Sequence, residues 1–483
     1  MNVRELEPKS LWNHFADLNA VPRPSKKEER VIEFMMKFGQ SLGMETIQDE
    51  IGNVIIKKPA TVGQENKQTV VLQSHLDMVH QKNADTVFDF DKQGIEMFVD
   101  GDWVRAKGTT LGADNGIGVA AIMAILKSTD IPHPAIEALF TIDEETGMTG
   151  AMKINPKNIT GRILLNLDTE DDDELSIGCA GGIDTNTSYS LTYEAIPSDF
   201  KQLTISLRGL LGGHSGMDIH LGRGNANKWM NRVLYHLISV LDVRLCALDG
   251  GSLRNAIPRE STMTVAVPAT HVNVARTEID KITAIIDAEY RTIEKDATWN
   301  VLETNSFKES IQKTDLEVIV NSVYAVQNGV YRMSPSIPGL VEASSSLARV
   351  WIAENKFMTQ SLQRSSVESS KMDVANTIRA AFESNGVSVV QNGEYPGWEP
   401  KADSPILKVM HEIYRSRFQE EPQVKACHAG LECGILGEHF EGMDMISFGP
   451  NIRGAHSPDE CVQVSSVQKF WGYLLEVLTK IPN

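Results

Sequence analysis

Long apolar runs, a cysteine framework and a leader-like start are all missing from this 483-residue sequence. No stretch approaches the ~18 apolar residues that a membrane-spanning helix needs. The five cysteines are odd in number and mostly far apart, which argues against a disulfide framework. The start, Met1 to Leu18, has no basic segment followed by an apolar one, so no signal peptide is expected. These absences predict a cytoplasmic protein without a membrane partner.

Basic residues are the scarcer charged class. Lys and Arg number 46 against 64 Asp and Glu, which leaves a formal net charge of −18. A surface this acidic repels phosphate groups and argues against nucleic acid or an anionic membrane as a partner. Hydrophobic residues make up 41% and charged residues 23%, an ordinary globular composition that excludes a disordered chain or a fibre. The length favours about two to four domains.

The two ends of the chain share a pattern that the middle does not have. Apolar strand-like runs without clean alternation are separated by helical stretches, which is typical of an α/β sheet covered on both faces. The middle instead has longer helical stretches between strands. We therefore predict one catalytic domain made of residues 1–190 and 394–483, interrupted by an inserted α+β lid at 191–393, with a hinge at 395–398 (Tyr-Pro-Gly-Trp).

Local signals place several elements near the motifs discussed below. Ser25 and Glu28 form a capping-box pattern, and apolar residues then recur at helical spacing up to Gly43. The other expected elements are helices at 119–126, 224–241, 272–295, 315–328, 406–418 and 467–480, and strands at 69–72, 135–142, 162–167, 202–207, 261–267, 298–303 and 445–448.

His75 and Asp77 follow the first buried strand and lie two residues apart. Residues at that spacing on a strand point the same way. His75 is therefore a candidate metal ligand whose second ring nitrogen Asp77 holds. The alternative is a surface pair on a loop, and a motif this short leaves both interpretations open.

Asp114 lies in the glycine-rich segment 109–118, just before an apolar helix. The glycines allow close approach of the backbone to another group. Taken alone, Asp114 fits a helix N-cap better than a ligand. A phosphate-binding loop is excluded because the Gly-Lys-Ser/Thr ending is absent.

Asp143, Glu144 and Glu145 directly follow another apolar strand. Carboxylates this close together repel one another, so burying them requires either protonation or a bound cation. Neighbouring Glu144 and Glu145 point in different directions, so one can bind metal while the other faces a substrate. The alternative is a solvated acidic turn.

Asp168 ends a further strand, and His456 follows a strand near the C-terminus. In open α/β sheets, ligands bind at the edge where the strands end. The combined set of two histidines and three carboxylates, with Glu144 to spare, suits Zn²⁺, Mn²⁺ or Co²⁺. Two ions about 3.5–4 Å apart and bridged by one Asp fit that number of ligands.

These motifs resemble the two-zinc metallopeptidase family that includes aminoacylases, carnosinases and peptidase T. The segments that carry the resemblance match in order and spacing: Ser74–Val79, Leu111–Gly116, Asp143–Gly147 and Asn166–Glu170. Further segments resemble one branch of that family, the bacterial aminoacyl-histidine dipeptidases: Gly178–Gly182, Gly212–Gly216, Arg254–Arg259, Tyr395–Trp398, His428–Gly434 and His456–Glu460. One departure is Ser344–Leu347, which lacks an asparagine of the family's segment.

The resemblance implies a zinc-exopeptidase-like, mixed-sheet catalytic domain and a role for each motif residue. Asp114 would bridge two divalent ions, zinc first and cobalt or manganese as alternatives. His75 and Asp168 would complete one ion's ligands, and Glu145 and His456 the other's.

The family also implies the residues that act on the substrate. Asp77 would orient His75, and Glu144 would be the general base towards a metal-bridging hydroxide. His214 from the lid would stabilise the oxyanion. The substrate's terminal carboxylate would be held by Asn255, Arg364 and Gly430.

The resulting prediction is a cytosolic, homodimeric metallo-dipeptidase that hydrolyses unblocked dipeptides, including Xaa-His and β-Ala-His. The alternatives are a deacylase of N-acyl amino acids or a tripeptidase with the same two-metal site, and a catalytically silent binding protein. An intact Glu144 beside all five ligands argues against the silent form. Family and glycine-rich turn together also predict a cis peptide bond between Asp114 and Asn115.

Overall fold

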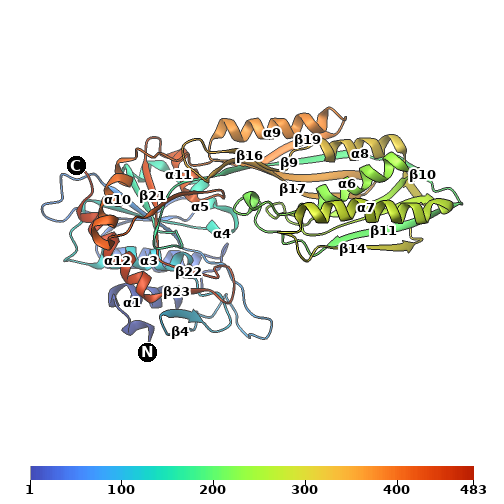
Figure 1. The fold of residues 1–483 in the computed structure, drawn as a ribbon. Helices are drawn as coiled ribbons and strands as arrows, with labels where there is room; N and C mark the ends of the chain where they lie inside the picture. Colours follow the sequence, from blue (N-terminus) through green and yellow to red (C-terminus); the bar gives the residue numbers. More distant parts are fainter. Residues whose placement is uncertain (1) are drawn as a thin grey trace. The chain divides into compact units, whose positions relative to one another are not determined.

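The computed structural model describes residues 2–483 and divides them into two compact units (Figure 1). The first unit comprises residues 2–178, 398–426 and 431–483, and the second comprises 179–397 and 427–430. Residues 179–397, which make up most of the second unit, are thus an insertion in the chain of the first. The sequence predicts boundaries at 190/191 and 393/394. The structure divides the chain at 178/179 and 397/398, because β9 and β19 belong to the second unit's sheet.

An eight-stranded mixed sheet forms the centre of the first unit, in the order β1-β2-β6-β3-β7-β21-β8-β20. The neighbours β6, β3, β7 and β21 run parallel, whereas β1, β2 and β8 are antiparallel to their neighbours. The bounds are β1 Glu45–Gln48, β2 Val54–Lys58, β3 Val70–His75, β6 Ile136–Thr141, β7 Ile163–Asn166, β8 Glu174–Cys179, β20 Gln423–Cys427 and β21 Asp444–Ser447.

The parallel strands of this sheet are covered on both faces. Every residue of β3, β6 and β7 is buried, as their continuous apolar runs predict. Helix α3 is buried along nearly its whole length and packs on β3 and α1. The helices of the unit are η1 Val3–Glu5, α1 Lys9–Asn19, α2 Glu29–Ser41, α3 Ala113–Lys127, α4 Glu144–Gly147, α5 Thr149–Met152, η2 Pro156–Asn158, α10 Pro405–Phe418, α11 Glu432–His439 and α12 Val464–Thr479.

A small antiparallel sheet of four strands, in the order β22-β23-β5-β4, completes the first unit. Its strands are β4 Met97–Asp100, β5 Trp103–Ala106, β22 Ile452–Arg453 and β23 Cys461–Gln463. The loop between β22 and β23 carries His456. Among the helices of residues 2–483, none has the length and apolar character needed to span a membrane.

The second unit is built on a nine-stranded antiparallel sheet in the order β14-β11-β13-β12-β17-β18-β9-β19, with β16 paired to β17. The strands are β9 Gly181–Ser190, β11 Phe200–Arg208, β12 Arg244–Gly250, β13 Ser261–Pro268, β14 Thr298–Thr304, β16 Gly329–Met333, β17 Val341–Ala353, β18 Lys356–Ser365 and β19 Ser388–Tyr395. Strands β10 Tyr193–Ala195 and β15 Glu309–Ile311 form a separate pair.

Helices pack on this sheet and enclose a large apolar core. Trp229, Leu234, Val265 and Phe357 are among its buried members. The helices are η3 Ile219–Leu221, α6 Ala226–Val240, η4 Ala269–His271, α7 Val272–Tyr290, α8 Lys313–Ala325 and α9 Glu368–Glu383. A mixed-sheet α/β unit interrupted by an α+β unit is the fold class that the sequence predicts, and the prediction is confirmed.

The expected elements agree with the observed ones to within six residues at each end, but the predicted capping box is wrong. Helix α2 begins at Glu29 with Glu28 as its N-cap. The Ser25 hydroxyl instead donates to Asp77 Oδ2, at 2.8 Å. Tertiary contact with a buried carboxylate has replaced the local cap.

Candidate metal centre

Strand ends bring most of the predicted metal ligands to one edge of the first unit's sheet. His75 is the last residue of β3, and Asp168 lies two residues beyond the end of β7. Glu144 and Glu145 open the short helix α4, three residues after β6 ends at Thr141. Because β6, β3 and β7 are parallel neighbours, these side chains share an edge.

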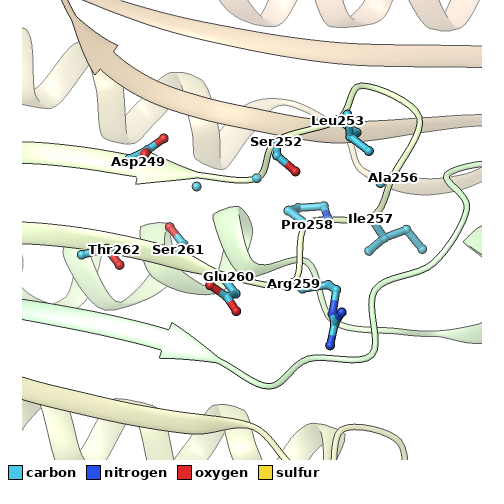
Figure 2. A pocket seen from close by; sticks show the side chains of 12 residues that line it. Asp249, Ser252, Leu253, Ala256, Ile257, Pro258, Arg259, Glu260, Ser261 and Thr262 are labelled. Carbon is cyan, nitrogen blue, oxygen red and sulfur yellow. The ribbon is translucent and has the colours of Figure 1, made fainter. Parts of the chain in front are cut away.

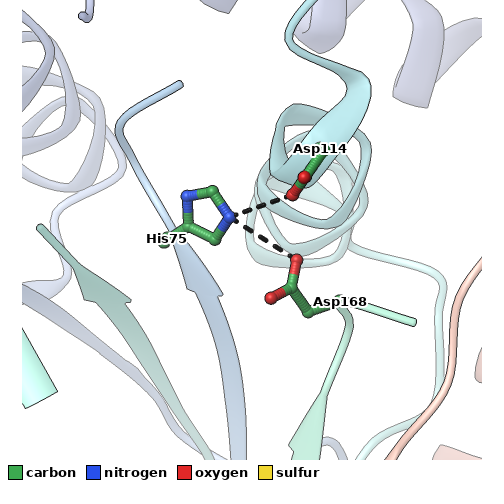
Figure 3. Close-up of side chains that lie close together, drawn as sticks. All are labelled: His75, Asp114 and Asp168. Carbon is green, nitrogen blue, oxygen red and sulfur yellow. Dashed lines mark hydrogen bonds and ion pairs between the residues drawn. The ribbon is translucent and has the colours of Figure 1, made fainter. Parts of the chain in front are cut away.

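His75 faces two carboxylates (Figure 3). Its Nε2 lies 3.1 Å from Asp114 Oδ1 and 3.5 Å from Asp168 Oδ1. Asp114 is in the first turn of α3 but has non-helical backbone angles, and Gly112 is the N-cap. The interpretation of Asp114 as a helix cap is therefore wrong. The peptide bond between Asp114 and Asn115 is cis, as predicted.

His456 faces the same Asp114 from the other side. Its Nε2 lies 3.3 Å from Asp114 Oδ2 and 2.9 Å from Glu145 Oε2. Asp114 thus offers one oxygen to each histidine. His456 has a φ of +63°, and its loop holds the side chain about half exposed.

Asp77 is completely buried beneath these residues. Its Oδ1 lies 3.4 Å from His75 Nδ1, and its own carbonyl oxygen lies slightly closer, at 3.1 Å. The backbone N–H groups of Glu144 and Glu145 both donate to the Asp77 carboxylate, as does Ser25. Asp77 therefore joins the β3 end to the start of α4.

The electrostatics of the cluster are dominated by carboxylates. Burial alone would lower the pKa of His75, but Asp168, Asp114 and Asp77 raise it well above its ordinary value. Hydrogen bonds to Asp114 and Glu145 raise the pKa of His456 to about 11. A site that draws positive charge onto both histidines also attracts a divalent cation.

Burial also changes the pKa values of the carboxyl groups in the cluster. Burial raises the pKa of Asp168 to about 6 and that of Glu144 well above its ordinary value. For Asp114 the two histidines outweigh burial and lower the pKa.

The donor set fits divalent ions. In each of three groups of residues, the potential ligand atoms lie within 4.8 Å of one another. The groups are His75, Asp114 and Asp168; His75, Glu144 and Glu145; and Asp114, Glu145 and His456. Glu145 Oε1 and Asp168 Oδ1 are buried and accept no hydrogen bond from residues 2–483. Buried carboxylate oxygens without a donor, beside imidazole nitrogens, are the ligands that zinc and similar ions take.

Two buried residues near the centre were missed by the sequence analysis. The Arg23 guanidinium donates to the carbonyl oxygens of Leu76, Asp77 and Gly112. The Glu460 carboxylate accepts backbone N–H groups of the Asp114 segment. Glu460 ends the family segment His456–Glu460, and that segment could have drawn attention to it. Arg23 stands between two prolines and belongs to no recognisable pattern.

The remaining predicted residues lie in the second unit. Arg364 is buried; its Nη2 lies 3.4 Å from His214 Nε2, and its Nη1 donates to the Tyr395 hydroxyl at 2.8 Å. Asn255 is exposed and its carbonyl accepts the Ser215 N–H. Gly430 is half-buried in the segment after β20.

Burial and the nearby Arg364 guanidinium lower the pKa of His214 to about 4. Burial is also the main cause that lowers the pKa of His428 to about 3. The His428 Nε2 lies 2.7 Å from Ser344 Oγ, so this buried histidine is held against β17 within the second unit.

The loop that carries Asn255 encloses a half-open cavity of about 440 Å³ (Figure 2). Ser252, Leu253, Ile257 and Arg259 line it together with the ends of β12 and β13. Arg259 Nε donates to the carbonyl of Leu210, which fixes the loop against the segment leading to His214.

Comparison with known proteins places the chain in a family. Residues 71–480 match the model of peptidase family M20/M25/M40. The cytosol non-specific dipeptidase of Escherichia coli is 41% identical over 480 residues, which cover 99% of both chains. The crystal structure of aminoacylhistidine dipeptidase from Vibrio alginolyticus matches with a TM-score of 0.93 and 43% identity, over 100% of this chain and 99% of that one.

A more distant structure shows the fold alone: aminopeptidase PepT from Bacillus cereus, with a TM-score of 0.57 and 16% identity over 99% of each chain. The chain belongs to peptidase family M20/M25/M40, and the predicted family is confirmed. Membership of this metallopeptidase family implies the use of divalent metal, for which the three groups above are the candidate ligands.

Proposed function

We propose that this chain is a cytoplasmic metallo-dipeptidase that hydrolyses unblocked dipeptides, including those with C-terminal histidine. The observation that carries the proposal is the joined cluster of His75, Asp114, Glu145, Asp168 and His456, with Glu144 beside it. The E. coli relative named a cytosol dipeptidase and the V. alginolyticus aminoacylhistidine dipeptidase support the substrate class and the location.

Two divalent ions, with zinc as the first choice, would be held in the cluster. His75 and Asp168 would hold one, Glu145 and His456 the other, and Asp114 both. The two Asp114 oxygens, each near a different histidine, support that division. When bound, such ions lower the pKa of a water molecule towards neutrality and polarise the carbonyl of the scissile bond.

Glu144 would act as general base and then as general acid. Its carboxylate would take a proton from the attacking water and pass it to the nitrogen of the leaving amino acid. The backbone N–H of Glu144 donates to the Asp77 carboxylate at 3.0 Å, which fixes the start of α4. The Glu144 side chain takes no part in this contact. Asp77 would keep the His75 ring in one orientation.

The second unit would supply the groups that bind the substrate. His214 Nδ1 accepts the backbone N–H groups of Gly216 and Met217, at 3.2 and 3.0 Å. In the neutral ring the proton then sits on Nε2, where it could donate to an oxyanion.

Arg364 would bind the substrate's terminal carboxylate together with Asn255 and Gly430. The guanidinium is buried, and its Nε has no hydrogen-bond partner among residues 2–483. A buried donor of fixed geometry beside Nη groups suits a carboxylate, which accepts two parallel hydrogen bonds.

Assays with Ala-His and β-Ala-His, compared with N-acetyl amino acids and tripeptides, test this function. Hydrolysis of the dipeptides that stops after metal chelation and returns with Zn²⁺ is the expected result. Preference for N-acetyl amino acids or tripeptides would overturn the dipeptidase assignment in favour of a deacylase or tripeptidase, and no hydrolysis at all would favour a binding protein. A homodimer is the assembly we propose, since two-fold pairing is the commonest form; sedimentation equilibrium measures it.

A further inference from the structure

Glu460 makes an unusual set of contacts close to the metal centre. Its side chain is 2% exposed, and its two oxygens accept four consecutive backbone N–H groups. Oε2 accepts those of Leu111 and Gly112, at 2.7 and 2.9 Å. Oε1 accepts those of Ala113 and Asp114, at 2.7 and 3.2 Å.

These four donors lie at the start of α3, where a helix leaves N–H groups without internal partners. The positive end of the helix dipole favours a carboxylate there. Gly112 has a φ of +69°, a conformation that side chains rarely adopt, and this turns successive N–H groups towards one anion. Because both Glu460 oxygens already accept N–H donors, neither is available to a metal ion.

Glu460 also lies four residues after His456, at the base of the same loop. Its own N–H donates to the Ser457 carbonyl, and β23 begins at the next residue. One carboxylate therefore ties the loop of His456 to the segment of Asp114. Those two residues, with Glu145, form one of the three candidate ligand groups.

Arg23 links the Asp114 segment to another part of the centre. It donates to the carbonyls of Gly112, Leu76 and Asp77, so it ties the Asp114 segment to the end of β3, where His75 lies. The His75 side of the centre thus has a second anchor, Arg23, in addition to Glu460.

We propose that Glu460 is a positioning residue that holds His456 and Asp114 at the separation needed by one of two metal ions. It acts through the backbone and binds neither metal nor substrate. Its loss should therefore weaken the ion at Asp114, Glu145 and His456 more than the ion at His75, Asp114 and Asp168. The inference rests on the two-ion arrangement of the proposed function.

Calorimetric titration of the metal-free full-length chain with Zn²⁺ tests the proposal. In Glu460→Gln the side-chain NH₂ group would face two of the backbone N–H donors. The side chain could then no longer accept all four backbone hydrogen bonds. We expect one ion to bind as in wild type and the other about 10- to 100-fold more weakly, the range for residues that support metal ligands. His456→Ala should weaken the same ion, and the double variant should lose no more than His456→Ala alone.

Asp459→Asn is the matched control, because it removes the same charge from the exposed neighbouring residue and should leave both ions unchanged. Unchanged binding of both ions in Glu460→Gln, equal weakening of both, or a wild type that binds a single ion would each overturn the proposal. If Glu460→Gln does not fold, as judged by circular dichroism of the metal-free chain, Glu460→Asp is titrated by the same criteria.

The readout needs no peptidase activity. A wild type that binds two ions but hydrolyses no dipeptide would refute the proposed function and leave this inference standing.

Discussion

The histidines at the candidate metal centre of the first unit and two histidines of the second unit have opposite pKa shifts. In the first unit, carboxylates raise the pKa of His456 to about 11 and that of His75 well above its ordinary value. In the second, burial and the Arg364 guanidinium lower the pKa of His214 to about 4 and that of His428 to about 3. Excess negative charge thus favours the charged ring at the candidate metal centre, whereas burial and a nearby positive charge favour the neutral ring in the second unit.

This difference bears on what each unit binds. A cluster with more carboxylates than histidines attracts cations, which suits a metal centre. A buried guanidinium with neutral imidazoles and hydroxyls attracts an anion, which suits the carboxylate or oxyanion of a substrate. The chemistry of a histidine here depends on its neighbours.

The largest effect is expected at Glu144. Glu144→Gln should lower kcat for Ala-His by about 10²–10⁴-fold, the usual contribution of a general base, while Zn²⁺ binding is retained. Steady-state kinetics with metal content measured on the same samples checks this. Glu441→Gln, an exposed glutamate of the same unit, is the control and should be fully active. Equal rates for the two variants would remove Glu144 from the mechanism.

The second prediction concerns acid and the neutral histidine of the second unit. The pKa of His428 is about 3, below the 6.5 of an unfolded chain, so the unfolded chain binds more protons between these values. The contribution of neutral His428 to the free energy of unfolding is therefore fully present well above pH 6.5. It is lost as the pH falls through this window, by about 3 kcal/mol between pH 6.5 and 4.

Urea unfolding of the metal-free chain at several pH values measures this dependence. His428→Gln cannot titrate, so its stability should fall less steeply with acid than that of wild type. His220→Gln, which alters an exposed histidine of the same unit, should follow the wild-type slope. A His428→Gln slope as steep as wild type would show that His428 is not held neutral.

At Arg364 the charge can be kept while the geometry is lost. Arg364→Lys should lower kcat/KM for a dipeptide by about 10–100-fold, because Lys lacks the planar fork that pairs with a carboxylate. A dipeptide amide, which has no terminal carboxylate, serves as the internal control, since the substitution should barely change its rate. Equal losses on both substrates would contradict carboxylate recognition.

The smallest effect is expected at Ser25, one of three donors to Asp77. Ser25→Ala removes a single hydrogen bond worth about 0.5–1.5 kcal/mol, so affinity for Zn²⁺ should fall by roughly 2- to 10-fold. Competition with a metal-binding dye measures the affinity. A larger loss than that of Asp77→Ala would be incompatible with a role exerted through Asp77.

The sequence was most informative where a strand ends in a polar residue. Apolar runs before His75, Asp143 and Asp168 predicted buried strands. The structure shows that these strands are parallel neighbours, whose ends meet at one edge. Asp114 was less certain, since its position before a helix also fits a cap. Only the fold distinguished the two interpretations, because its side chain faces His75 and His456.

Other features left no local pattern to read. Ser25 looked like a helix cap and instead supports Asp77, which lies 52 residues away in sequence. Arg23 reaches the segments of Leu76 and Gly112 through backbone carbonyls, which any residue type supplies. Contacts made to the backbone leave no signature in the partner's side chains, so spacing and residue type could not predict them.

By itself the amino-acid sequence determined the class of fold, the family, and the residue types available for metal chemistry, because hydrophobic periodicity and short motifs are local properties. The tertiary structure decided which of those residues share a site, how Asp114 divides its oxygens, and which histidines are charged. Those outcomes depend on distances and burial between segments up to several hundred residues apart, such as Leu111 and Glu460.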